Sequence, residues 1–68
     1  MSLEPHQQRV IDEKADLDDK IVALYVFIEK NAIYRSLNAV EQDRLRSQHY
    51  HMRRYSEILG ERIQGFPR

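Results

Sequence analysis

Apolar residues recur at intervals of three, four and seven along most of this chain, the spacing that places them on one stripe of a long helix. In the first half these positions are Val10, Leu17, Ile21, Leu24 and Ile28. Lys14 stands where a further apolar residue is expected, and we interpret it as a solvated lysine whose stem covers apolar surface. Pro5 suits a first helical turn, where its missing N–H costs nothing. The pattern predicts a helix from about residue 4 to about residue 30.

The same spacing returns in the second half. The apolar positions there are Leu45, Met52, Tyr55, Ile58, Leu59, Ile63 and Phe66. Asn38 followed by Glu41 fits a capping box, with Ser36 as the alternative cap. Gly60 lies inside the pattern and suggests a close helix contact, at a cost of about 1 kcal/mol relative to Ala. We expect a second helix from about residue 39 to about residue 63.

A short connector, residues 31–38, joins the two helices. Asn31 is a candidate to end the first helix in a left-handed conformation. Ile33, Tyr34 and Leu37 are apolar for a loop and are expected to pack across the hairpin end. Because a short connection makes helices antiparallel neighbours, the sequence predicts an all-α, two-helix antiparallel hairpin as a single domain over residues 1–68.

Two helices cannot enclose a core, so apolar surface is left uncovered. Such surplus is expected at Tyr25, Phe27, Tyr50, Ile58 and Phe66. A chain of 68 residues without cysteine has no disulfide to support a core that supplies only about 3–5 kcal/mol. Self-association is the remaining support, and we expect a homo-oligomer.

The charges cancel overall but are unevenly placed. Residues 1–34 hold four basic and seven acidic residues, whereas residues 35–68 hold seven basic and four acidic ones. Halves of opposite sign favour lying side by side, within one hairpin or between chains. Arg53 and Arg54 with Tyr50 and Tyr55 suggest phosphate contacts and stacking on nucleic acid. Glu57 and Glu61 on the same helix instead favour a salt-bridged, solvated surface. Nucleic-acid binding is therefore the less favoured interpretation.

No catalytic grouping, cofactor motif or metal-ligand set is present in the sequence. His49 and His51 are two residues apart and would point in different directions on a helix. The acidic run at residues 12–19 lacks the spacing of a calcium loop and fits a solvated helix face. We expect a protein that is not an enzyme. No apolar stretch approaches a membrane span and no signal peptide is evident, which predicts a cytoplasmic protein.

His6, Arg9 and Lys20 suggest a ligand site. His6 would stack on a base, and Arg9 and Lys20 would meet phosphates. Fourteen residues of helix separate His6 from Lys20, about 21 Å, so one chain cannot bring them onto one small ligand. They would converge only across an oligomer interface. The alternative is that they are unrelated surface residues.

A longer segment carries a family resemblance. Residues 6–21, together with Leu24, Phe27 and Ile28, resemble the helical hairpin domain of phage anti-CBASS and anti-Thoeris sponge proteins. The second helix is similar in its order of Gln, Met, Tyr and Leu-Gly-x-Arg-Ile. Here these residues are Gln48, Met52, Tyr55, Leu59, Gly60, Arg62 and Ile63. The resemblance covers nearly the whole chain, and the absence of a further β-rich domain makes it similar to the anti-CBASS type.

The resemblance implies a phage or prophage protein that forms helical hexamers from interlocked trimers. It implies sequestration, without cleavage, of cyclic oligonucleotide second messengers, with cyclic dinucleotides first and trinucleotides second. His6 matches the family's base-stacking aromatic, usually Tyr, and Lys20 matches its phosphate-binding Lys. Arg62 matches an Arg of the trinucleotide pocket, where Val22 replaces a polar residue. The alternatives are a hairpin that serves only for assembly and a nucleic-acid binder.

Overall fold

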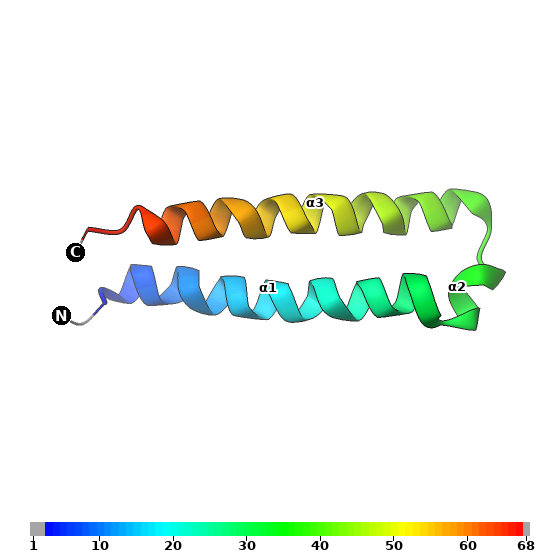
Figure 1. Ribbon diagram of the computed structural model, residues 1–68, viewed down its shortest axis with the longest axis horizontal. Helices are drawn as coiled ribbons and strands as arrows, with labels where there is room; N and C mark the ends of the chain where they lie inside the picture. The colour runs from blue at the N-terminus through cyan, green and yellow to red at the C-terminus, as the bar shows by residue number, and fades with distance from the viewer. Residues whose placement is uncertain (1–2, 68) are drawn as a thin grey trace.

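Two helices of 26 residues each lie side by side and antiparallel (Figure 1). α1 spans Pro5–Lys30 and α3 spans Ala39–Gln64, and the start of α1 lies at the same end of the hairpin as the end of α3. The computed structural model describes residues 3–67, and that stretch contains no strand. The all-α antiparallel hairpin is confirmed, with helix bounds within one residue of those predicted. Within residues 3–67 no helix has the length and apolarity that a membrane crossing requires.

The connector contains a short helix that the sequence did not reveal. α2 spans Ala32–Ser36, so Asn31 does not end α1 in a left-handed conformation. Asn31 is extended, with φ −97° and ψ 127°, because its side chain accepts a hydrogen bond from the Ile33 backbone N–H at 2.8 Å and caps α2. Asn38 caps α3 as predicted, accepting from the Glu41 backbone N–H at 2.8 Å. Ser36 is not a cap; its hydroxyl donates to the Ile33 carbonyl within α2.

The hairpin end is fastened by Tyr34. This side chain is buried, and its ring packs edge-on against Phe27 with ring centroids 6.0 Å apart. Its hydroxyl accepts a hydrogen bond from Arg46 Nη1 at 2.8 Å, and its carbonyl accepts one from Gln42 Nε2 at 2.9 Å. Tyr34 and Leu37 pack at the hairpin end as expected, whereas Ile33 is 62% exposed and that prediction is wrong.

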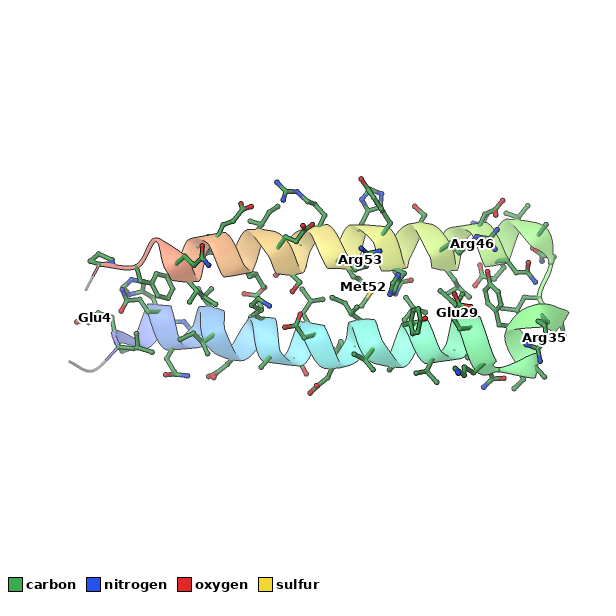
Figure 2. All side chains as sticks on the ribbon, viewed as in Figure 1. Glu4, Glu29, Arg35, Arg46, Met52 and Arg53 are labelled. Atoms are coloured by element: carbon green, nitrogen blue, oxygen red, sulfur yellow. The ribbon has the colours of Figure 1, made fainter. Side chains whose placement is uncertain are left out.

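The core is a thin seam between α1 and α3. Leu59 is fully buried, and Val10 and Leu17 join it from α1. Packed against these three are the half-buried residues Ile21, Met52, Ile63 and Phe66. Figure 2 shows Met52 pointing from α3 toward α1. The heptad positions of both predicted stripes therefore meet in one seam.

Three of the five residues predicted as uncovered apolar surface are indeed exposed: Tyr25, Tyr50 and Ile58. Phe66 is not, because it packs against the core just beyond the end of α3. Phe27 is half-buried against Tyr34. Uncovered apolar surface therefore lies along both helices and also near the ends of the hairpin, where Leu3, Ile33 and Val40 are exposed.

A polar cluster interrupts the seam midway. The Lys14 ammonium lies 2.8 Å from Asp18 Oδ2, and the Ser56 hydroxyl donates a hydrogen bond to Asp18 Oδ1 across the two helices. The Lys14 hydrogen bond, followed by that of Ser56, lowers the pKa of Asp18 below its ordinary value of 3.8. A β-carbon placed on Gly60 would stand 3.3 Å from Lys14 Cε, so Gly60 does permit the predicted close contact. Lys14 is therefore an inter-helix contact as well as a solvated lysine.

Candidate functional site

Three residue pairs fix how α1 and α3 are aligned. Lys14 lies over Gly60, Asp18 bonds Ser56, and the rings of Tyr25 and His49 lie 6.0 Å apart. Residue numbers in these pairs rise along α1 as they fall along α3, as they must for antiparallel helices. They lie along one broad side of the hairpin, which we call the groove face after the groove described below.

The predicted cations lie on the opposite broad side. Each residue of a helix advances about 100°, so Lys20, two residues after Asp18, points about 200° away from it. Arg62, two residues after Gly60, points away from the groove face by the same angle. Arg9 and Lys20 are separated by eleven residues of α1, close to three full turns, and so share a side. We call the side that carries Arg9, Lys20 and Arg62 the cation face.

Arg9 and Arg62 lie at nearly the same level along this face. Because Lys14 is level with Gly60, Arg62 is level with Asp12, about 4.5 Å along the axis from Arg9. Lys20 lies farther along, about 16 Å from Arg9. His6 is exposed in the first turn of α1, and the unbroken helix between His6 and Lys20 keeps the two apart as expected. One hairpin therefore offers a pair of arginines and a separate lysine.

The charges on the cation face are available to a ligand. Lys20 Nζ lies 3.0 Å from Asp16 Oδ2, but the Lys20 side chain is 66% exposed and such surface pairs contribute only about 0–1 kcal/mol. Arg9 and Arg62 are exposed and form no ion pair within residues 3–67. At these positions a phosphate would compete with one ion pair of the described residues, that of Lys20 with Asp16.

Tyr55 adds an aromatic ring that the sequence reasoning placed in the nucleic-acid alternative and not in the ligand site. The sequence placed Tyr55 in the apolar stripe of the second helix, but its side chain is 43% exposed. Tyr55 lies one residue before Ser56 and is level with Asp19, next to Lys20 on α1. Its angle of about 220° from Gly60 places it on the cation face. The sequence held no signal of this exposure, because Tyr55 lies about 40° from Leu59 on the helix, the same angle as the half-buried Ile63.

A groove of about 320 Å³ lies on the groove face. It is lined by Ile21, Val22, Tyr25, His49 and Arg53. Val22 is 61% exposed and lines the groove, so it projects from the side opposite Arg62. The trinucleotide pocket that the resemblance implies near both residues cannot form within one hairpin. The sequence alone did not indicate this groove, because its lining depends on how the helices are rotated against each other.

Most arginines of α3 pair with acidic residues of their own helix. Arg44 approaches Glu41 to 3.7 Å, Arg54 approaches Glu61 to 3.6 Å, and Arg46 pairs with Asp43. The predicted pairing is confirmed only for Glu61, which pairs with Arg54 at a spacing of seven residues rather than four; Glu57 forms no ion pair within residues 3–67. This pairing leaves fewer free cations for a nucleic-acid backbone.

No three histidine or acidic side chains of the described part gather to hold a metal ion. His49 and His51 contact different aromatic rings, those of Tyr25 and Tyr50, and so point in different directions as expected. The arrangement offers cations and flat rings on exposed faces, which suits binding of an anionic ligand with bases.

One family of proteins matches the chain. A family model described as Sequestin matches residues 4–65, which include α1, α2 and α3. Comparisons with curated proteins and with solved structures give no match. Because the family model matches well over half of the chain, the chain belongs to the Sequestin family.

Proposed function

We propose that this protein binds cyclic oligonucleotide second messengers and sequesters them without cleavage, as a phage or prophage protein that silences a bacterial defence. The observation that carries the proposal is membership of a family named for sequestering, on a chain whose cation face presents Arg9, Arg62 and Lys20 to solvent. A sponge acts by tight binding alone, so it needs no catalytic group.

Cyclic dinucleotides are the first ligand class. Such a ligand carries two phosphates and two flat bases, and it needs cations and stacking surfaces on facing walls. Arg9 with Arg62 and Lys20 would hold phosphates, while His6 and Tyr55 would stack on bases. Because these groups spread over the length of one face, we propose that each pocket forms between copies of a homo-oligomer, with the hexamer as the assembly the resemblance implies.

Cyclic trinucleotides are the second class. Arg62 is the proposed contact, and Val22 stands where the resemblance implies a polar residue. Because Arg62 and Val22 project from opposite sides, a pocket using both would take them from different copies. The apolar Val22 gives the trinucleotide one hydrogen bond fewer, so we expect weaker binding than for dinucleotides.

Titration calorimetry of the purified protein tests the proposal. Cyclic dinucleotides should give saturable heat with a fixed ratio of ligand to chain, and the ligand should be recovered intact by chromatography. Linear dinucleotides of the same bases serve as the control, since they should bind more weakly. An oligomer that gives no heat with any cyclic nucleotide would favour the alternative of a hairpin that serves only for assembly.

A further inference from the structure

The cation face combines its cations with aromatic rings, as surfaces that bind single nucleic-acid strands do. Tyr55 is level with Asp19, so it lies about 1.5 Å along the axis from Lys20. His51 is exposed and precedes Tyr55 by about one helical turn, which adds a second ring to the same side. Proteins that bind single strands without sequence preference use a cationic path and rings on which bases stack. By these groups alone the face would suit RNA or DNA.

Two carboxylates interrupt the cations on the α1 side of this face. Glu13 follows Arg9 by four residues of α1. Asp16 precedes Lys20 by the same interval. Residues three or four apart are neighbours on a helix surface, so the four side chains form one row in the order cation, acid, acid, cation. We call this row the mixed stripe; all four of its residues are exposed.

The two acids stand in the middle of the path between the cations. Arg9 and Lys20 are about 16 Å apart along the axis. Measured from Arg9, Glu13 is about 6 Å and Asp16 about 10 Å along it. A stacked strand carries a phosphate about every 3.4 Å of its axis, so a strand that spans both cations must place phosphates beside both carboxylates. A small ligand can meet either cation without crossing the middle.

Asp16 also occupies the cation at one end of the mixed stripe. Its Oδ2 atom lies 3.0 Å from Lys20 Nζ, and 69% of the Asp16 side chain is exposed. An exposed pair of this kind contributes little to the stability of the fold. Its larger consequence is for binding, because each phosphate that approaches Lys20 has to displace the carboxylate of Asp16 and lie close to it.

We propose that Glu13 and Asp16 are specificity residues that exclude single-stranded nucleic acid from the cation face. RNA carries the same phosphates and bases as a cyclic oligonucleotide, so attraction alone cannot distinguish the two. Selective sites commonly repel the wrong ligand as well as attracting the right one. The benefit of this exclusion rests on the proposed function, because a sponge covered by RNA could not take up a messenger. The exclusion itself is measured without a cyclic ligand.

Two double variants with the same change in net charge test the proposal. The first combines Glu13→Gln with Asp16→Asn and removes both acids of the mixed stripe. The control combines Asp12→Asn with Asp19→Asn, at exposed positions that each follow a buried seam residue by two. The control residues therefore point about 200° away from the seam and lie outside the mixed stripe. An effect of net charge alone would be equal in the two proteins.

Fluorescence anisotropy with a labelled adenine-only RNA of about twelve nucleotides, within the site sizes of single-strand binders, measures the result. Wild type and the control variant should bind this RNA weakly and alike. The stripe variant should bind at least about tenfold more tightly at low salt, because Lys20 is freed for a charged hydrogen bond. The slope of log K against log salt should steepen by about 0.7, the value for one further phosphate contact. Equal binding by the two double variants, or equally tight binding by wild type, would overturn the proposal.

A third substitution tests where the RNA lies. Adding Lys20→Ala to the stripe variant should remove most of the gain, and a gain that survives it would refute the proposal. Circular dichroism should show equal helical content in all of the variants, since every changed side chain is exposed. If the stripe variant unfolds, Asp16→Asn with Asp19→Asn as its control gives the same comparison. A failed titration with cyclic dinucleotides would count against the proposed function alone, because the RNA assay contains no cyclic ligand.

Discussion

Replacing Gly60 by Ala sets two effects of known size against each other. Alanine is favoured over glycine within a helix by about 1 kcal/mol. The added methyl group would stand 3.3 Å from Lys14 Cε, so the lysine stem must move by a few tenths of an ångström. Lys14 is tied to Asp18 by a half-exposed ion pair, with 31% and 45% of the two side chains exposed, and such pairs contribute about 0–1 kcal/mol. We expect the two effects largely to cancel in the wild-type background.

The cancellation should disappear when Lys14 is shortened. In a Lys14→Ala background nothing remains near the new methyl group, so Gly60→Ala should stabilise the protein by about 1 kcal/mol. For a domain of this size, that is an increase in Tm of about 4–8 °C. The four proteins should be melted by circular dichroism at one chain concentration, because self-association makes Tm depend on concentration. Equal effects of Gly60→Ala in both backgrounds would show that Lys14 does not lie over Gly60 and would refute the alignment of the two helices.

Three further perturbations test the cation face, the polar cluster and the core. Lys20→Ala should weaken cyclic dinucleotide binding about 10- to 150-fold in calorimetry, the loss of about 1.5–3 kcal/mol from a charged hydrogen bond, with no change in oligomer mass. Lys30→Ala, at the last turn of α1, is its control and should change neither. Asp18 has a lowered pKa when folded, so its stabilisation is present above pH 3.8 and lost as pH falls below that value; Asp18→Asn should flatten the dependence of Tm on pH in this acidic range. Leu59→Ala should cost about 2–5 kcal/mol and abolish a cooperative thermal transition, since the core of so small a chain supplies about 3–5 kcal/mol.

The helices were predictable because each has a strong local signal. Heptad spacing over more than three turns defined α1 and α3, and Asn38 gave a cap that the structure confirms. α2 was not predictable in the same way, because five residues are too few to show a helical period. Asn31 ends α1 as predicted, but it is extended rather than left-handed because it also caps α2.

The rotation of each helix about its own axis could not be read from the sequence. The stripe of the second helix includes Leu59 and Tyr55, yet the first is fully buried and the second is 43% exposed. A seam between only two helices is narrow, so residues at the edges of an apolar stripe stay in solvent. From the sequence, Arg9, Lys20 and Arg62 were candidates. It could not be predicted that they lie on one side of the hairpin or that Val22 lies on the other.

That rotation determines what the chain can bind, and the polar cluster is the feature that fixes it. An apolar seam alone tolerates small rotations, since dispersion contacts have little directional preference. Two contacts of the polar cluster resist such rotation, because each is lost within a small displacement. They are the hydrogen bond from Ser56 to Asp18 and the close contact of Lys14 with Gly60. They hold the apolar groove on one side and the cations on the other. A rotation of either helix by one residue, about 100°, would turn its groove-lining residues or its cations toward the seam and so end this separation. Lys14 and Asp18 therefore cost some stability in a seam that apolar residues could fill, but they fix which side chains share a face.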